Sequence, residues 1–347
     1  MGGRVTIKDV ASEADVSIKT VSNVINGSGR MRPETRERVE NAMRKLGYTV
    51  NLSARAIRSG GTRLIGLNIF DFSQPFASYL TDKVIDFAKA RQYGVIINTY
   101  GSDGMGLADN IEETYRLGAD GWIFFSERAL VNEGAVLQQP YPVVLAGDYL
   151  TYGKSDLVTM PNVEAVKQAV GRLLDSGTKA IALLGAPPGM EDWETIKQQR
   201  EGTQALRTQG YVQAFLDRGF EVDWRYVIPV HRWNQHGGVQ ATAAMLDSLP
   251  CPEAVVCLND AMALGAVHEL QRRGLRVPND VQLIGFDNVP EAEYSVPALT
   301  TIDPHVDDYA KHAVDMLIER IEGYNGPART YTTDFTLVER ASTRLVR

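Results

Sequence analysis

Cysteine is scarce in this 347-residue chain. Only Cys251 and Cys257 are present, too few for a disulfide framework. They flank an apolar, strand-like run at 254–256, so we expect reduced thiols in or beside the core of an intracellular protein. The chain also lacks an apolar stretch of the roughly 20 residues that cross a bilayer, and the hydrophobic segment of an N-terminal signal peptide. We therefore expect a cytoplasmic protein without a membrane partner.

Motifs of the common enzyme classes are missing too. The chain has no Gly-x-x-x-x-Gly-Lys-Ser/Thr phosphate loop and no Gly-x-Ser-x-Gly nucleophile turn. Gly101, Gly104 and Gly106 do not have the spacing of a dinucleotide-binding fingerprint. His231 and His236 have no cysteine nearby, which argues against a zinc site. We therefore expect a protein that is not an enzyme and uses neither a cofactor nor a metal ion.

Acidic residues are few in one part of the chain only. Residues 1–63 contain twelve Lys or Arg and six Asp or Glu, a net charge of +6, although the whole chain carries −7. The remaining residues hold 24 basic and 37 acidic side chains, a net charge of −13. A basic head on an acidic body indicates a polyanionic partner for the head alone. Binding to that partner should depend strongly on salt.

The basic head has the pattern of three short helices. Thr6 and Ser17 can cap the first two, Asp15-Val16 fits the turn between them, and the third runs from Pro33 to a stop at Gly47. Apolar residues recur at helical spacing on the inward faces, at Ile7, Val10, Ala11, Ala14, Val21, Val24, Ile25, Val39, Ala42, Met43 and Leu46.

The second helix has an outer face suited to DNA. Ile18 can contact a thymine methyl group, Lys19 can reach a guanine edge or a phosphate, and Asn23 can pair with base edges. Four arginines near the start of the third helix can neutralise phosphates: Arg30, Arg32, Arg36 and Arg38. The alternative is a small helical bundle with a basic surface. The caps, the turn and the charge asymmetry favour a helix-turn-helix that reads a major groove.

Four runs carry a family resemblance: Thr6–Ala11, Val16–Asn26, Arg32–Val39 and Leu46–Tyr48. They closely resemble the lactose-repressor (LacI/GalR) family of transcription regulators, and the similarity continues along nearly the whole chain to Leu337–Thr343. The resemblance implies a DNA-binding surface that includes Thr6, Ser17, Ile18, Lys19, Thr20, Ser22, Asn23, Asn26, Arg30, Tyr48, Asn51, Ala54 and Ile57.

The resemblance also makes Asn51–Arg58 a hinge helix. In the family this helix forms on DNA, pairs with its twin from the second subunit and wedges an apolar side chain into the minor groove, which bends the duplex. The usual wedge is Leu, whereas this chain has the stiffer Ile57, so weaker kinking is expected. The alternative for Ile57 is an ordinary packing role in a linker helix. Arg32 is a second departure, since a Ser or Thr cap is common there.

From Leu64 onward, short apolar runs alternate with amphipathic stretches such as Val163–Leu174 and Met262–Arg273. The apolar runs are 64–67, 94–97, 122–125, 142–145, 180–184, 227–230, 254–258 and 281–284. Alternating strands and helices predict parallel sheets, and two sets of about four strands predict two lobes. The expected fold class is α/β: a three-helix helix-turn-helix domain (1–50), a hinge helix and linker (51–63), and two doubly wound parallel lobes (64–347). The resemblance implies a body like a periplasmic sugar-binding protein, with chain crossings near 158–163, 288–292 and 300–335.

Ligands of open parallel sheets bind beyond the carboxyl ends of the strands. By position and resemblance, the candidate effector-binding residues are Phe72, Phe76, Asp148, Arg207, Trp233, Asn259 and Asp287. Arginine, carboxylates and amides can bind hydroxyl groups, and an aromatic ring can stack on the C–H face of a sugar. Alternatives stay open: Asn259 and Asp287 can cap the next helices, Asp148 can be a turn residue and Trp233 can be core.

These patterns predict a sequence-specific, DNA-binding transcription repressor that acts as a homodimer on a near-palindromic operator. A small effector, expected to be a sugar or sugar derivative, would control it allosterically. One alternative is a purine or nucleoside sensor on the same scaffold. Another is a solute-binding protein without a DNA function, which predicts an export signal.

Overall fold

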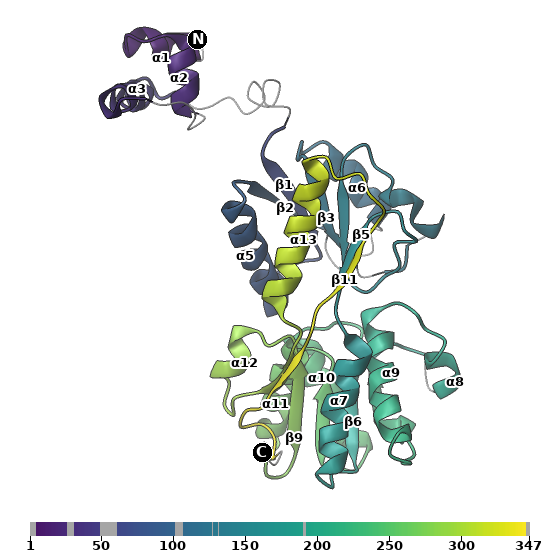
Figure 1. The fold of residues 1–347 in the computed structure, drawn as a ribbon. Coiled ribbons are helices and arrows are strands. Elements are labelled where there is room, and N and C mark those ends of the chain that lie inside the picture. The colour runs from purple at the N-terminus through teal and green to yellow at the C-terminus, as the bar shows by residue number, and fades with distance from the viewer. Residues whose placement is uncertain are drawn as a thin grey trace. The chain divides into compact units, whose positions relative to one another are not determined.

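The computed structural model describes residues 5–25, 31–48, 61–100, 107–126, 128–130, 132–189 and 192–344. The chain forms two compact units, Met1–Thr62 and Arg63–Arg347 (Figure 1). Among the helices in these ranges, none is both long enough and apolar enough to cross a membrane.

The first unit contains the three expected helices, α1 (Ile7–Glu13), α2 (Ile18–Ile25) and α3 (Pro33–Leu46). Their inward faces form one small core of Val10, Ala11, Ala14, Val21, Val24, Val39 and Ala42. Pro33 occupies the first turn of α3, and Gly47 ends that helix in the left-handed conformation, with φ of 63°. Arg32 stands at the N-cap of α3 without a capping side-chain bond.

The two predicted N-caps differ. Ser17 caps α2 as expected, because its hydroxyl accepts a hydrogen bond of 3.1 Å from the Thr20 N–H. Thr6 stands at the N-cap position of α1, but its hydroxyl donates to Asp9, 2.7 Å away, as does its backbone N–H. The carboxylate of Asp9 is therefore the group that closes this end of α1.

The second unit is built on two six-stranded sheets, one in each lobe (Figure 1). The first sheet has the order β11-β5-β4-β3-β1-β2, and all of its pairings are parallel. Its strands are β1 (Leu64–Ile69), β2 (Gly94–Thr99), β3 (Gly121–Phe125), β4 (Val143–Ala146), β5 (Asp156–Thr159) and β11 (Thr330–Thr332). Its helices are α5 (Pro75–Ala90), α6 (Leu107–Tyr115), the short η1 (Asn132–Leu137) and α13 (Val306–Ile321). We call this half lobe 1.

The other half, lobe 2, has the sheet order β12-β10-β9-β8-β6-β7, with only β12 antiparallel to its neighbour. Its strands are β6 (Ile181–Ala186), β7 (Val227–Pro229), β8 (Ala254–Cys257), β9 (Gln282–Phe286), β10 (Thr300–Asp303) and β12 (Thr336–Val338). Its helices are α7 (Asn162–Asp175), α8 (Trp193–Ile196), α9 (Thr203–Leu216), the short η2 (Trp224–Tyr226), α10 (Gln235–Ser248), α11 (Asp260–Arg272) and α12 (Pro290–Tyr294).

All eight apolar runs of the sequence form strands, and the α/β class with two lobes is confirmed. The four strands that the sequence did not indicate are β5, β10, β11 and β12. The chain crosses between lobes after β5, between β10 and α13, and between β11 and β12. The expected crossing near 288–292 is wrong. Asp287 and Asn288 have φ of 113° and 51°, and the chain turns there into α12 and stays in lobe 2, where it continues as β10 beside β9.

The helices that complete lobe 1 come from distant parts of the chain. α13 lies beside α5 on one face of the first sheet (Figure 1). Leu80 and Val84 of α5, Leu317 of α13, and Ile65 and Leu67 of β1 belong to the same buried apolar core. The other face packs Trp122 and Phe124 against α6 and η1. A segment that begins after residue 305 therefore supplies part of the core of the lobe that begins at residue 64.

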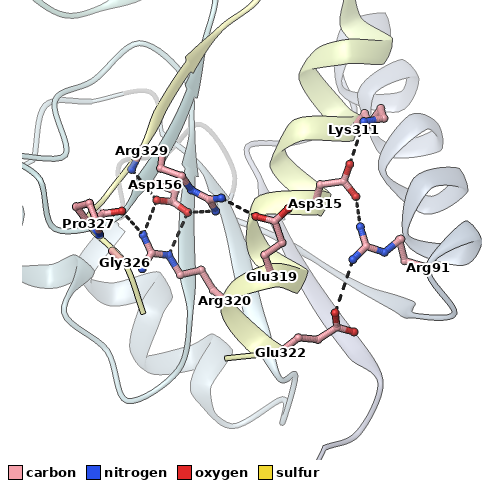
Figure 2. Close-up of polar contacts among 10 residues, drawn as sticks. All are labelled: Arg91, Asp156, Lys311, Asp315, Glu319, Arg320, Glu322, Gly326, Pro327 and Arg329. Atoms are coloured by element: carbon pink, nitrogen blue, oxygen red, sulfur yellow. Dashed lines mark hydrogen bonds and ion pairs between the residues drawn. The ribbon is translucent and has the colours of Figure 1, made fainter. Parts of the chain in front are cut away.

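A buried carboxylate fixes this returning segment. Asp156 on β5 is fully buried and accepts hydrogen bonds of 2.7 to 3.1 Å from the guanidinium groups of Arg320 and Arg329 and from the Arg329 N–H (Figure 2). Arg329 also reaches Glu319 at 2.5 Å. Burial alone would raise the pKa of Asp156, but the hydrogen bonds from the two arginines hold it below its ordinary value.

In lobe 2, α10 and α11 cross very closely. A Cβ atom on Gly238 would lie 2.2 Å from the Met262 carbonyl oxygen, and one on Gly265 would lie 2.1 Å from the Gln235 carbonyl oxygen. Glycine at both positions lets the two backbones touch. As a result, the loop before α10 and the start of α11 lie side by side.

We predict that Asp156→Asn destabilises the second unit by about 3 kcal/mol, because it removes the charge that two partly buried arginines share. The measurement is urea unfolding at pH 7. Since the folded-state pKa of Asp156 is depressed, its contribution is present above about pH 4 and is lost as the pH falls further. The difference between the two proteins should shrink there.

Glu194→Gln is the matched control, because it removes one charge from a solvent-exposed pair with Lys197. Such pairs contribute little to stability, so its unfolding midpoint should stay close to that of the unaltered protein. Equal midpoints for the Asp156 and Glu194 variants would show that Asp156 does not anchor the segment.

Candidate functional site

The second helix of the first unit carries an exposed recognition surface. Ile18 is 42% exposed and Lys19 is also exposed, although Ile is usually buried. Ser22 and Asn23 are half-buried beside them, and Val21 and Val24 face the core. The Ser17 hydroxyl lies 2.8 Å from that of Thr20. The Ser17 cap and the apolar inner face thus hold α2 in place. Its outer side presents one apolar, one cationic and two polar side chains, those of Ile18, Lys19, Ser22 and Asn23.

The other residues predicted for this surface fall into two groups. Thr6 is exposed at the start of α1, and Tyr48 is half-buried against the three-helix core. Asn26, Arg30, Asn51, Ala54 and Ile57 lie outside the described residues, as does the proposed hinge helix Asn51–Arg58. Arg32 at the N-cap of α3 and Arg36 and Arg38 within that helix are exposed.

A cavity of about 440 Å³ lies in the second unit, at the carboxyl ends of strands from both sheets. Its lining includes six of the seven predicted effector-binding residues: Phe76, Asp148, Arg207, Trp233, Asn259 and Asp287. The lining also includes Phe70, Asp71, Ser73, Gln74, Phe125, Ser126, Arg128, Gly147, Tyr149, Met160, Thr203, Gln204, His231, Arg232, Asn234 and Tyr309. The strand-end rule for parallel sheets therefore located the cavity.

Arg207 lies at the bottom of this cavity and is 3% exposed. Its Nε donates to Asn162 over 2.7 Å, its Nη1 donates to the Leu258 carbonyl, and the guanidinium carbon lies 3.4 Å from the centroid of the Phe286 ring. Asp287 lies 3.8 Å from Nη1. Burial lowers the pKa of Arg207, and the carboxylate of Asp287 opposes that shift. The guanidinium is thus held in one orientation before any ligand arrives.

Asp287 follows β9 at a backbone φ of 113°, a conformation that turns its side chain toward Arg207. Burial raises the pKa of Asp287 to about 7, although Arg207 lowers it. Its neighbour Asp260 is fully buried and accepts hydrogen bonds from the Thr301 hydroxyl at 2.6 Å and the Val289 N–H at 3.0 Å. Burial also raises the pKa of Asp260, and Asp287 adds to that shift.

Asp148 is a contact between the lobes as well as a cavity residue. Its carboxylate accepts hydrogen bonds from the hydroxyls of Thr159 in lobe 1, at 2.7 Å, and Thr203 in lobe 2, at 2.6 Å. Its backbone carbonyl accepts from the Gly202 N–H at 2.7 Å. This is more than a turn residue does, and it ties the loop after β4 to the start of α9.

Asn259 combines a helix cap with a contact across the cavity. Its Oδ1 accepts the Met262 N–H at 2.9 Å, which caps α11. Its Nδ2 donates to Gln74 of lobe 1 at 3.0 Å and to the Trp233 carbonyl at 2.9 Å. The helix cap that the sequence offered for Asn259 is therefore present, the residue also lines the cavity, and its contact with an effector stays a prediction. The Trp233 side chain is half-buried, and its Nε1 is buried without a hydrogen-bond partner among the described residues.

The aromatic wall of lobe 1 differs from the prediction at one position. Phe72 is 49% exposed and does not line the cavity, although Asp71 and Ser73 on either side of it in the turn between β1 and α5 do. Phe70 at the end of β1 lines the cavity instead, and its ring packs edge-on against Phe125 with centroids 5.5 Å apart. Phe76 lies 6.0 Å from the same ring.

Several cavity residues were missed in the sequence. Gln74 precedes Pro75 at the start of a helix, so the strand-to-helix turn could have indicated it. Tyr309 comes from α13, which returns to lobe 1 only after the lobe crossing, so its place at the cavity depends on the tertiary fold. His231 and Arg232 stand directly before the predicted Trp233 and could have been included with it.

We predict that Asn259→Ala destabilises the second unit by about 1 kcal/mol through loss of the α11 cap, whereas Asn259→Ser recovers most of that loss. Serine supplies an acceptor for the Met262 N–H but not the amide that reaches Gln74. Urea-unfolding midpoints of the two variants measure the difference. Gln74→Ala serves as the control, since it removes the contact between lobes and leaves the cap in place. If the Ala and Ser variants unfold at the same midpoint, the cap is not what Asn259 contributes to folding.

Each of the two units matches a known protein family. The family described as bacterial regulatory proteins, lacI family, matches residues 6–51, and the periplasmic binding protein-like domain matches residues 170–343. Catabolite control protein A from Priestia megaterium is 32% identical over 314 residues, which are 90% of this chain and 91% of that protein.

Solved structures agree. A LacI-type transcription regulator from Bifidobacterium animalis subsp. lactis DSM 10140 is 56% identical with a TM-score of 0.78, and the match covers 81% of this chain and 100% of the other. The transcriptional regulator CelR in complex with cellobiose is 28% identical with a TM-score of 0.69, and the match covers 98% and 100%. The chain therefore belongs to the LacI family of bacterial regulatory proteins and is a DNA-binding transcription regulator.

Proposed function

We propose that this regulator is a repressor whose second unit senses a small effector, and that the effector is a sugar or sugar derivative. The observation that carries the proposal is the cavity of about 440 Å³, in which Arg207, Asp287 and Asn259 meet the aromatic rings of Phe76 and Trp233. Fixed polar groups beside an apolar wall suit a polyol, which has hydroxyl groups at its rim and C–H groups on its faces. These groups bind, and we assign them no catalytic role.

The relatives support this class of effector. CelR was solved with cellobiose bound, and it matches this chain over nearly its whole length. A purine or nucleoside is the second candidate, because Phe70, Phe76 and Phe125 form a cluster on the lobe 1 wall on which a planar base could stack. A solute-binding protein without a DNA function is set aside, since residues 6–51 match the DNA-binding family.

We assign the segments as follows: residues 1–50 read DNA, residues 51–63 form a hinge and linker, and residues 64–347 bind the effector and a second subunit. The protein works in the cytoplasm, where bacterial DNA lies. Two subunits bind a near-palindromic operator, each with α2 in a major groove. Ile18, Lys19 and Asn23 read bases, and Ile57 is the minor-groove wedge.

Control by the effector follows from lobe closure. An effector that binds one arrangement of the lobes more tightly shifts the protein toward that arrangement, and operator and effector then change each other's affinity by the same factor. Asp148 with Thr203 and Asn259 with Gln74 are two side-chain contacts between lobes that such a shift would alter.

An exposed apolar patch on lobe 2 supports the dimer. Tyr294 at the end of α12 is 78% exposed, and Val296 two residues later is 80% exposed. Large apolar side chains this exposed and this close together are typical of a surface that another protein covers. We propose that the second subunit covers them.

We predict that the double substitution Tyr294→Asp with Val296→Asp weakens the dimer at least tenfold, because two carboxylates would be buried without partners. Sedimentation equilibrium of the full chain measures the dissociation constant. Leu216→Asp, which changes another exposed apolar residue on α9, is the control and should leave the constant unchanged. A dimer of unaltered affinity in the double variant would place the interface elsewhere.

For the DNA surface, we predict that Lys19→Ala changes the preferred base at one operator position. Arg36→Ala on α3 should instead lower affinity for all sequences alike and reduce the salt slope by about 1, because it removes a phosphate contact. Selection of binding sites from a random DNA library with each variant, followed by titration at several salt concentrations, measures both effects.

A fragment that lacks residues 1–62 is the negative control, since Arg63–Arg347 forms a compact unit of its own. It should bind no operator and should keep its response to effector. Operator binding by the fragment, or identical behaviour of the Lys19 and Arg36 variants across sequences, would refute the assignment of α2 as the reading helix.

A further inference from the structure

We infer that the effector is an anionic sugar derivative, whose phosphate or carboxylate group is bound by Arg232 at the mouth of the cavity. The inference rests on the proposed function, because it names the chemical class of the effector for the same cavity. It is carried by one contrast: the charged groups at the bottom of the cavity are paired with protein groups, whereas a cationic group at the mouth is not.

The charges at the bottom are satisfied within the protein. Arg207 donates to Asn162 and to the Leu258 carbonyl and lies 3.8 Å from Asp287. Asp148 accepts hydrogen bonds from two threonine hydroxyls. The bottom holds one cation, Arg207, beside two carboxylates, Asp148 and Asp287, so it carries no excess positive charge that would bind an acidic group. These groups can bind hydroxyls of a ligand through their remaining lone pairs and N–H groups.

The mouth of the cavity is different. Arg128, His231 and Arg232 line the cavity and are exposed, so they surround its outer part. Across the described part of the chain, the Arg232 guanidinium makes no hydrogen bond and no ion pair. The third acidic residue of the lining, Asp71, accepts the Ser73 N–H at 2.7 Å. The mouth therefore carries unneutralised positive charge on the lobe 2 side.

The backbone that bears Arg232 is held in place. Asn234 caps α10 through a bond of 2.9 Å to the Gly237 N–H, and the Trp233 carbonyl accepts from Asn259. The Arg232 carbonyl lies so close to Gly237 that a Cβ atom there would be 2.0 Å from the oxygen. The anchored loop therefore fixes the Cα position from which the Arg232 side chain reaches the cavity.

The N-terminal end of α10, which follows Arg232, adds to the positive electrostatic potential at the mouth of the cavity. α10 is a 14-residue helix whose first turn holds no acidic residue, so no carboxylate of that turn offsets the positive end of its dipole. Asn234 at this end lines the cavity beside His231 and Arg232. An ordinary exposed arginine on a surface would also lack a partner, but it would not line a ligand cavity next to the start of such a helix.

A phosphate monoester and a carboxylate share the chemistry that this arrangement recognises. Both present two or more oxygens in the plane of a guanidinium group, which can bind them with two parallel hydrogen bonds. We therefore place the neutral hydroxyl-bearing body of the ligand between Arg207, Asn259 and Trp233 and its acidic group at Arg232.

The test uses isothermal titration calorimetry of the full chain at low salt. The probes are glucose with glucose 6-phosphate and glucuronate, ribose with ribose 5-phosphate, and inorganic phosphate alone. We expect at least one acidic sugar to bind tenfold or more tightly than its neutral parent and than phosphate. Whether the phosphate ester or the carboxylate binds more tightly identifies the acidic group. Arg232→Gln should abolish the preference, and Arg232→Lys should retain part of it.

Arg200→Gln is the matched control, since Arg200 is exposed and lies three residues before the lining residue Thr203 but does not itself line the cavity. It should leave the preference unchanged. Equal affinity for acidic and neutral sugars, or a preference that survives in Arg232→Gln, would overturn the inference. If neutral sugars bind and Arg207→Ala alone removes that binding, the sugar sensor stands and only the anionic group is wrong. If no probe binds while the chain still binds operator DNA, the inference and the proposed effector class both fail, and the DNA-binding function stands.

Discussion

The carboxylate of Asp156 is the constraint on which the two-lobed unit depends. It joins β5 to α13 and β11, two elements that follow it by about 150 residues or more, through the guanidinium groups of Arg320 and Arg329 (Figure 2). α13 covers lobe 1 beside α5, and its Tyr309 lines the cavity. The same ion pairs therefore hold together the core of lobe 1 and one wall of the ligand site. A buried carboxylate that accepts hydrogen bonds from two guanidinium groups and a backbone N–H fixes both the position and the orientation of the segments that carry them. An apolar contact alone is not directional.

The bottom of the cavity likewise holds buried charged groups that have hydrogen-bonding or ionic partners within the protein. Buried charge is tolerated because every charged group there has a partner: Arg207 has Asn162, the Leu258 carbonyl, Asp287 and the Phe286 ring. Asp148 has two hydroxyls. The chain therefore assembles a polar site within a largely apolar unit and leaves its unpaired positive charge in the solvent-exposed mouth, where hydration makes it inexpensive.

The sequence predicted the parts of the fold that are encoded locally. Strands such as Trp122–Phe125 are apolar on both faces, because helices cover both sides of their sheet, and such runs are easy to detect. β5, β10, β11 and β12 are three or four residues long and rich in Thr, and they pair at or near sheet edges, so they carry no comparable apolar signal. In the cavity, the strand-end rule found Asp148, Asn259 and Asp287. It included Phe72, whose side chain is exposed, in place of Phe70 two residues earlier. It had no access to Tyr309, whose position depends on a lobe crossing.

The amide of Asn259 has two hydrogens, and both are already used, one by the Gln74 side chain of lobe 1 and one by the Trp233 carbonyl of lobe 2. A ligand oxygen that takes a hydrogen bond from this amide must displace one of those acceptors. If it displaces Gln74, it breaks a bond that joins the first residue before α5 to the first residue before α11. Occupancy of the cavity and contact between the lobes then compete for a single hydrogen atom, and α5, which begins at that point, lies beside α13 in lobe 1 (Figure 1).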